Sequence, residues 1–241
     1  MRLEEATVMV VDDEPELREI FSAWLGRKGC RVLTASNGQE ALKTMQKEAV
    51  DVLVSDIRMP VMGGIELVRT ICKMDLLIPS IIFVTGFGDV DPREMHALGV
   101  EALLEKPLER KNLLRVLDEC LMAREDLWLT PLPEPADQSV TRQLESMHNA
   151  AGICTFQLGR GGCCFAIDRP LEEEQTIELD FCFAREGLRL KAQGTVRWVS
   201  IDASHAGVAF QYVDPGCRNW VIGTIHKNTM RKFIPSCVQI T

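Results

Sequence analysis

Four polar stretches of the sequence carry residue types suited to binding a cation and a phosphoryl group. Each stretch follows a short apolar run of the kind that forms a buried strand. The residues are Asp12 and Asp13 after the first run, Asp56 after the third, Thr85 after the fourth, and Lys106-Pro107 after the fifth. Because the carboxyl ends of parallel strands lie along one edge of a sheet, we expect these side chains to meet there.

A cluster of three carboxylates has a definite chemical requirement. Its members repel one another, and their pKa values rise unless a cation lies among them. We predict Mg²⁺ as this cation, because a hard ion prefers carboxylate, carbonyl and water oxygens. Lys106 adds a second, movable positive charge. Such a pocket is suited to receive a phosphoryl group, whose oxygens must be neutralised and positioned, and a carboxylate can serve as the nucleophile.

Each of these residues also has a purely structural interpretation. An acidic pair after a strand often caps the next helix, and Asp13 or Glu14 could serve in that way. Thr85 could cap a loop, and Lys106-Pro107 could form a simple turn. Packing alone does not require all of these residue types at the ends of the right strands, so we favour the functional interpretation.

The elements that must position these residues alternate along the first half of the chain. Short apolar runs occupy residues 8–11, 31–35, 52–55, 80–84 and 102–104. Segments of helical period follow them at residues 16–28, 38–48, 64–74, 89–98 and 108–123. Five β–α repeats with nearly continuous apolar strands predict a doubly wound α/β fold, in which helices cover both faces of a parallel sheet.

The second half of the chain has a different periodicity. In "TIELDFCF", residues 176–183, apolar and polar side chains alternate, and "GTVRWVS" at residues 194–200 alternates likewise. Glycines punctuate these runs, as is typical of a small antiparallel β-barrel. We also predict a short helical stretch near residues 140–149 and a terminal amphipathic helix at about residues 215–230.

Three prolines, at positions 131, 133 and 135, separate the two halves. Alternate prolines stiffen a chain and exclude a helix, so we interpret this stretch as a spacer. The predicted organisation is a domain of residues 1–124, a proline-rich linker of residues 125–139 and a second domain of residues 140–241.

The composition is typical of a cytoplasmic protein. No apolar run approaches the roughly 20 residues that span a bilayer, and acids stand where a signal peptide would be basic. The nine cysteines form no CxxC pair, and most are expected to be small core hydrophobes in a reducing compartment. The net charge of −8 and the lack of a helix-turn-helix pattern argue against DNA binding. Because the second half shows no His/Cys/Ser constellation, we do not expect an enzyme that turns over a separate substrate.

Residues 4–124 resemble a response-regulator receiver domain of two-component systems. The segments that carry the resemblance are "VVDDEPELREIF", "DVLVSDIRMPVMGG", "IIFVTGFGD" and "EKPL", which follow in the family's order and at similar spacing. The resemblance implies a phosphorelay protein in which Asp56 accepts a phosphoryl group from a phosphohistidine. The donor would be a sensor histidine kinase or a phosphotransfer protein.

The resemblance also implies a set of metal ligands. Asp13, Asp56 and the main-chain carbonyl of Arg58 would hold Mg²⁺, and Asp12 would contribute directly or through a water molecule. These groups are all oxygen donors, as Mg²⁺ requires.

The remaining roles that the resemblance implies concern the phosphoryl group. Lys106 would pair with the phosphoryl oxygens, and its peptide bond to Pro107 would be cis. Thr85 would donate its hydroxyl to the phosphate and draw the following loop with it, while Gly86 would leave room for the phosphodonor.

One feature of the receiver family is absent. An aromatic switch residue usually stands three places before the lysine, whereas this chain has Leu103. A ring flip therefore cannot report the state of Thr85, so either the loop after Thr85 and the fourth helix carry the signal or the coupling is weak. We expect the face of the fourth helix, fifth strand and fifth helix to mediate homodimer contacts or domain docking.

Residues 140–241 resemble a PilZ domain, a β-barrel family known for binding the second messenger cyclic di-GMP. The resemblance rests on the order of "FQLGRGGCCFAI", "LEEEQTIELDF", "GTVRWVS" and "AGVAFQYVD", which precede a C-terminal helix. It implies that the second half is the output domain of the regulator.

The nucleotide-binding motifs of the PilZ family are mostly missing. The family uses Arg-x-x-x-Arg before the barrel, whereas Arg142 here has Gln138 and Ser146 at the corresponding distances. The family's Asp-x-Ser-x-x-Gly is replaced by residues 157–162, which keep only the last glycine. Each lost charge-assisted hydrogen bond would cost about 1.5–3 kcal/mol of binding. The remaining candidates for an anion site are Arg142, Arg160, Arg185 and Arg189.

These observations combine into one expectation and one alternative. We expect a response regulator whose phosphorylation on Asp56 controls a PilZ-like output domain that acts mainly by contact with a downstream protein. The alternative is a cyclic di-GMP receptor, whose output domain binds the nucleotide under control of the receiver.

Overall fold

A computed structural model describes residues 3–74, 79–86, 95–96, 98–122, 126, 128–129, 131, 135–147, 155–200, 202–227 and 233–234. The chain divides into two compact units, residues 1–122 and 123–241, which are described separately below. This division assigns the predicted linker, residues 125–139, to the second unit.

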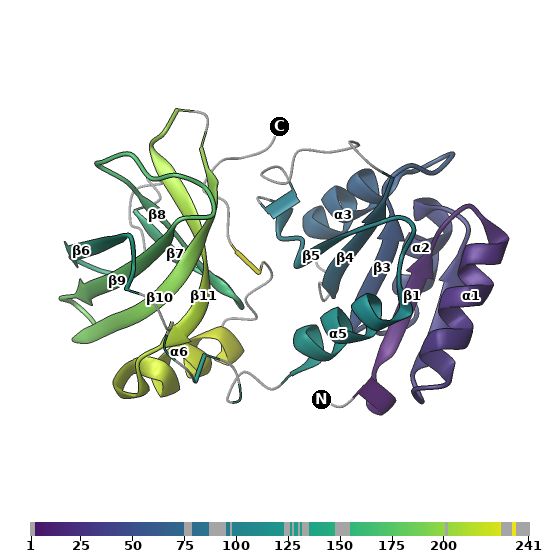
Figure 1. Cartoon of the computed structure of the whole chain (residues 1–241), viewed down its shortest axis with the longest axis horizontal. Helices are drawn as coiled ribbons and strands as arrows, with labels where there is room; N and C mark the ends of the chain where they lie inside the picture. The colour runs from purple at the N-terminus through teal and green to yellow at the C-terminus, as the bar shows by residue number, and fades with distance from the viewer. Residues whose placement is uncertain are drawn as a thin grey trace. The chain divides into compact units, whose positions relative to one another are not determined.

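The first unit is built on a five-stranded parallel sheet (Figure 1). Its strands are β1 (Thr7–Val11), β2 (Arg31–Ala35), β3 (Val52–Asp56), β4 (Ser80–Thr85) and β5 (Ala102–Glu105), in the order β2-β1-β3-β4-β5. The helical elements are η1 (Leu3–Glu5), α1 (Pro15–Gly26), α2 (Gly38–Met45), α3 (Gly64–Lys73) and α5 (Arg110–Leu121). The predicted parallel α/β fold is confirmed, and most of the predicted helix at residues 89–98 lies outside the described residues.

The two faces of this sheet form two separate cores. Met9, Leu53 and Phe83 face α2 and α3, whereas Val10 and Val54 face α1 and α5. Because both faces are covered, β1, β3 and β4 are buried almost throughout, which explains their continuous apolar sequences. The chain order reverses between β1 and β3, and the carboxyl edge at such a reversal is where ligands bind in open α/β sheets.

The described part of the second unit is a curled six-stranded sheet with one helix (Figure 1). Its order is β6-β9-β10-β11-β8-β7, and every pairing is antiparallel except that of β6 with β9. The elements are β6 (Gln138–Leu144), β7 (Phe156–Leu158), β8 (Gly162–Ala166), β9 (Thr176–Phe183), β10 (Leu188–Val199), β11 (His205–Val213) and α6 (Pro215–Lys227). Among the described residues no backbone pairing joins β6 to β7, so closure into the predicted barrel is not seen.

The prediction of a helical stretch near residues 140–149 was wrong. Residues 138–144 form β6, which pairs with β9 from Gln138 opposite Ile177 to Leu144 opposite Phe183. Val140 is buried in the core while its neighbours in the strand are exposed. This pairing with a distant strand outweighs the local helical preference of a polar segment.

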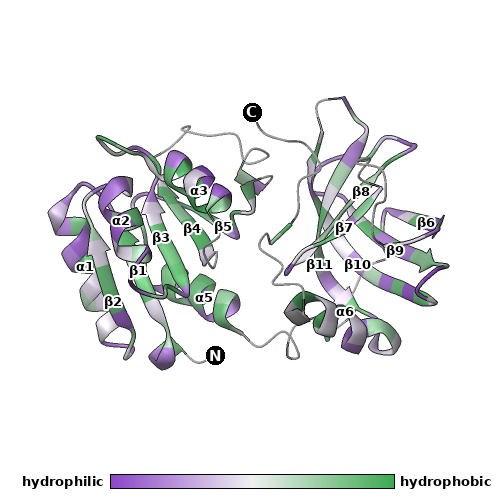
Figure 2. Ribbon diagram, turned by 180° about the vertical axis from the view of Figure 1, so that it is seen from behind, coloured by the Kyte–Doolittle hydropathy of each residue, from purple (hydrophilic) through white to green (hydrophobic). Residues whose placement is uncertain are grey.

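Aromatic side chains fill the inside of the curled sheet. Phe156 contacts Phe181 and Phe183 edge-on, with ring centroids 5.5 and 4.9 Å apart. The alternation of β9 directs Ile177, Leu179, Phe181 and Phe183 into this core and its polar residues outward. In Figure 2, β3 and β4 are mainly green, whereas β9 and β10 carry alternating bands. The continuous and the alternating apolar patterns therefore correspond to strands covered on both faces, as in β3 and β4, and to strands covered on one, as in β9.

Residues outside the strands complete the second unit. Trp128, within the predicted linker, is 7% exposed in this core and meets Phe210 edge-on at 5.5 Å. The main-chain oxygen of Trp128 accepts hydrogen bonds from Val213 N and Arg218 Nη2. On the opposite face of the sheet, Ile234 is buried in a small cluster with Trp198. The second unit is therefore packed by residues that precede its strands in the sequence and by residues that follow them.

Candidate functional site

The first component of the site is the end of β1. Asp12 is 1% exposed, whereas Asp13 projects to the surface. Asp12 Oδ1 accepts a hydrogen bond of 2.9 Å from Glu14 N, and Pro15 then begins α1. The main chain therefore turns directly from a buried strand into a helix, and the two acids stand at the turn.

Asp56 ends β3, next to β1 in the sheet. Its Oδ1 accepts hydrogen bonds from the main-chain nitrogens of Ile57, at 2.6 Å, and Arg58, at 3.2 Å. The loop that follows is closely packed, because a Cβ on Gly64 would collide with the carbonyl oxygen of Asp56. Ser55 Oγ donates to that same oxygen at 2.8 Å. The carboxylate of Asp56 is thus held at a fixed position, and its side chain is 12% exposed.

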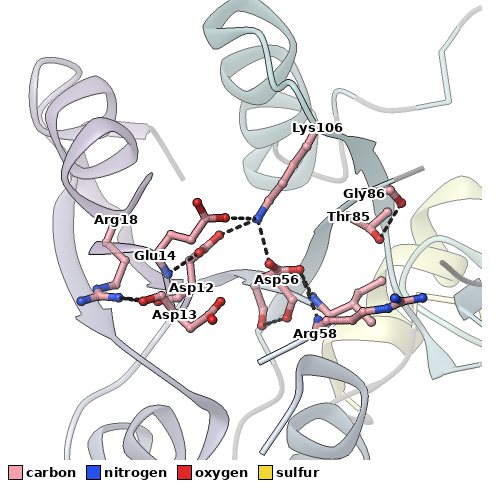
Figure 3. Close-up of polar contacts among 11 residues, drawn as sticks. Asp12, Asp13, Glu14, Arg18, Asp56, Arg58, Thr85, Gly86 and Lys106 are labelled. Carbon is pink, nitrogen blue, oxygen red and sulfur yellow. Dashed lines mark hydrogen bonds and ion pairs between the residues drawn. The ribbon is translucent and has the colours of Figure 1, made fainter. Parts of the chain in front are cut away.

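Lys106 links the acids from the loop after β5 (Figure 3). Its Nζ lies 2.7 Å from Asp56 Oδ2, 3.0 Å from Asp12 Oδ2 and 3.6 Å from Glu14 Oε1. Lys106 N donates to Thr85 O at 2.8 Å, and the peptide bond to Pro107 is cis. The ends of three strands therefore supply the two acids and the lysine that meet here.

Thr85 ends β4 beside this group and is 3% exposed. Its Oγ1 donates a hydrogen bond of 3.1 Å to the carbonyl oxygen of Gly86. Figure 3 shows this hydroxyl directed to Gly86, apart from the Asp56 carboxylate. Leu103, at the position of the expected aromatic residue, packs against the core cluster that contains Phe83.

Negative charge exceeds positive charge at the site. Carboxylate oxygens of Asp12, Asp13 and Asp56 all lie within 4.8 Å of one another, with one lysine among them. Burial raises the pKa of the Asp12 carboxyl, and the hydrogen bonds from Glu14 N and Lys106 offset only part of this effect. Burial lowers the pKa of Lys106, but its bonds to Asp56 and Asp12 outweigh burial and raise it overall. These groups fit Mg²⁺, since they offer several hard oxygen donors in a pocket that needs more positive charge.

Glu14 and Arg18 make contacts that were not predicted from the sequence. Glu14 is the third acid within 4 Å of Lys106 Nζ. Arg18 Nη1 donates to the carbonyl oxygens of Asp12, at 2.6 Å, and Asp13, at 3.0 Å. The signal for Arg18 was its place early in α1, because helical side chains lean toward the N-terminus of their helix.

The candidate anion residues of the second unit are not gathered in the same way. Arg142 pairs with Asp168, and Arg189 makes two hydrogen bonds to Asp180, of 2.7 and 2.6 Å. Arg160 lies half-buried in the turn before β8, and Arg185 is exposed in the turn after β9. The structure therefore shows two of these arginines neutralised by acids of their own chain.

One further finding concerns the helices. Within the described residues, none of the helices has the length and apolar character that a membrane crossing requires.

Comparison with known proteins places the first unit in a family. Residues 8–118 match the model of the response regulator receiver domain. The transcriptional regulatory protein GlrR of Escherichia coli is 34% identical over 117 residues, which are 48% of this chain and 26% of that protein. An uncharacterised 14.6 kDa protein of Leptolyngbya boryana is 32% identical over 124 residues, covering 50% of this chain and 94% of the relative.

One solved structure is similar over a comparable share of the chain. The chemotaxis response regulator CheY4 of Vibrio cholerae is 33% identical, with a TM-score of 0.44, and the match covers 48% of this chain and 98% of that one. This chain spans about a quarter of the length of the first curated relatives that it matches. Through residues 8–118, the chain belongs to the response regulator receiver domain family, whose members act in two-component signalling and use Mg²⁺.

Proposed function

We propose that this chain is a response regulator that is phosphorylated on Asp56 with the help of Mg²⁺. The observation that carries the proposal is the convergence of Asp12, Asp13, Asp56 and Lys106 at one edge of the sheet. Three acids with one lysine form a site that attracts a divalent cation, and the lysine can then turn to an incoming anionic group.

The transfer step follows from the position of each group. An oxygen of Asp56 forms a bond to phosphorus while the bond from phosphorus to the imidazole nitrogen of a phosphohistidine breaks, and the imidazole leaves with a proton. Lys106 Nζ, now 2.7 Å from Asp56 Oδ2, is placed to pair with a phosphoryl oxygen. Asp13, Asp56 and the Arg58 carbonyl would hold Mg²⁺, with Asp12 directly or through water. When bound, the ion would neutralise the charge that develops on the phosphoryl oxygens.

Phosphorylation would be sensed by Thr85. Its hydroxyl now donates to Gly86 O, so a phosphoryl group on Asp56 offers it a stronger, charged acceptor. Turning toward that acceptor would release Gly86 and move the loop after Thr85. With Leu103 in place of an aromatic residue, this loop and the fourth helix would carry the change. The face formed by the fourth helix, β5 and α5 would then mediate homodimer contacts or domain docking.

The second unit would act as a PilZ-like output domain that contacts a downstream protein. Two observations support protein contact: Arg142 and Arg189 are already paired with acids, and β9 turns its polar side chains outward. The sensor partner would be a histidine kinase or a phosphotransfer protein, and the location cytoplasmic. GlrR is named a transcriptional regulatory protein, but it matches only 48% of this chain and the family match ends at residue 118, so we do not extend that role to this chain. Nor do we propose turnover of a separate substrate.

Replacing the acceptor tests the central assignment. Asp56→Asn should reduce acid-labile phosphate uptake from acetyl phosphate with Mg²⁺ to background, because an amide does not form the acyl phosphate. Asp51→Asn is the matched control: Asp51 lies just before the other end of β3, where its carboxylate accepts from Thr7 N, so labelling should persist. Full labelling of Asp56→Asn would refute the proposal.

One observation favours the alternative of a cyclic di-GMP receptor. Arg160 stands directly before the glycine pair at which the resemblance places a nucleotide motif. Titration of cyclic di-GMP into the full chain by calorimetry separates the two functions. We expect no saturable heat at micromolar nucleotide. A saturable heat that is lost in Arg160→Gln and kept in Arg115→Gln, a surface change in α5, would establish the receptor instead.

A further inference from the structure

Arg18 makes an unusual contact for its place in a helix. It is the fourth residue of α1, near the positive end of the helix dipole, where a cation is normally unfavourable. Its guanidinium reaches back along the helix and donates from Nη1 to the carbonyl oxygens of Asp12 and Asp13, at 2.6 and 3.0 Å (Figure 3). Two charge-assisted hydrogen bonds explain why this position is occupied by an arginine.

These two carbonyls belong to the residues that must aim their carboxylates at the metal. α1 has no side-chain cap at Glu14, so its first residues do not fasten the preceding turn in the usual way. Arg18 bridges the two consecutive peptide groups and thereby limits rotation about the turn. The Asp12 and Asp13 carboxylates, held by this main chain, lie with Asp56 inside 4.8 Å.

We infer that Arg18 is a positioning residue for the divalent-cation site. The inference rests on the proposed function, because it concerns the same acids. Mg²⁺ tolerates little departure from octahedral geometry, so a small rotation of the turn should weaken its binding. In this role Arg18 would contact neither the cation nor the phosphoryl group. It acts through the main chain of Asp12 and Asp13.

The charge of Arg18 has an effect on Mg²⁺ binding that opposes its effect on the geometry of the turn. A guanidinium near three acids repels a divalent cation, so loss of its charge alone would strengthen Mg²⁺ binding. Arg18→Gln removes the charge and shortens the side chain below the reach of the carbonyls. Arg18→Lys keeps the charge but lacks the planar fork. Geometry and charge therefore predict different orders of affinity.

The experiment measures the Mg²⁺ affinity of the full chain by calorimetry, together with its urea unfolding curve. For Arg18→Gln we expect affinity to fall roughly tenfold, as when the groups that orient metal ligands are removed. Arg18→Lys should lie between this variant and the wild type. Arg115→Gln is the matched control, since Arg115 pairs with Glu119 on the exposed face of α5, and its affinity should not change.

Each result of this experiment either supports or overturns the positioning role of Arg18. Unchanged or tighter Mg²⁺ binding in Arg18→Gln would overturn the positioning role, even if its stability fell. If Arg18→Gln does not fold, Arg18→Lys decides: weaker binding with a normal unfolding curve supports the role, and wild-type binding overturns it. Failure of the proposed function looks different, because the wild type would then bind no Mg²⁺ and take up no phosphate on Asp56.

Discussion

The two units use the same kinds of charged residues in opposite ways. In the first, Lys106 meets three acids at the carboxyl edge of the sheet, namely Asp12, Glu14 and Asp56. In the second, arginines along the sheet each meet one acid, in the pairs Arg142–Asp168, Arg189–Asp180 and Arg197–Glu174. One arrangement leaves an excess of negative charge, and the other is balanced pair by pair.

Burial makes this difference functional. Asp12 is 1% exposed and Lys106 22%, whereas Asp180 is 25% and Arg189 59% exposed. Buried charges of unequal number are costly, and the cost is relieved by binding an ion. In an exposed one-to-one pair each charge already has its counter-charge, and such pairs contribute little to the free energy of unfolding. An acidic site is thus recognised by imbalance and burial, more than by the number of charged residues.

The largest effect is expected from neutralising the buried acid. Burial raises the pKa of Asp12 above its ordinary value of 3.8, so the free energy of unfolding decreases as pH rises through the folded pKa. At neutral pH the ionised form therefore destabilises the metal-free protein. Asp12→Asn should raise the free energy of unfolding in EDTA and weaken Mg²⁺ binding roughly tenfold. Urea unfolding and calorimetry measure both quantities.

Asp180→Asn is the matched change in the balanced unit. Its partner Arg189 lowers the pKa of Asp180, so the ionised carboxylate stabilises the fold above the unfolded pKa. The same acid-to-amide change should therefore cause a small decrease in stability and no change in Mg²⁺ affinity. If the two variants changed stability in the same direction, the contrast between the units would fail.

A smaller effect is expected at the hairpin between β10 and β11. Hydrogen bonds from Ser200, Ser204 Oγ and Ser204 N lower the pKa of Asp202 from 3.8 to about 2. This group stabilises the second unit above the unfolded pKa, and the contribution disappears as pH falls from about 3.8 toward 2. Ser204→Ala should raise the pKa while leaving it below 3.8, as measured by NMR titration of the carboxyl carbon.

The control for this titration is a serine elsewhere in the same unit. Ser139→Ala, in β6, should leave the midpoint of Asp202 unchanged. An unchanged midpoint in Ser204→Ala would mean that the Ser204 hydroxyl does not stabilise the ionised carboxylate of Asp202. This hairpin would then no longer be an example of a charge in the second unit that is satisfied by neighbouring groups.

The sequence predicted the positions of side chains best where they directly follow a recognisable strand. Because strands β1, β3 and β4 are continuous apolar runs, the residues after them had to lie at one edge, and Asp12, Asp56 and Thr85 do. Contacts that depend on which strands of the second unit pair, or on where a long side chain reaches, could not be predicted. The pairing of β6 with β9, the partner of Arg142 and the reach of Arg18 depend on tertiary packing that no local pattern encodes.

Trp128 has a practical consequence for dividing the molecule. Its indole lies in the second core and its carbonyl oxygen is tied to Arg218, although proline content alone would set the boundary beyond it. A recombinant fragment that starts at residue 140 would lack this ring and leave Phe210 without its edge-on neighbour. Chimeras that join the second unit to another receiver should therefore place their junction before residue 128.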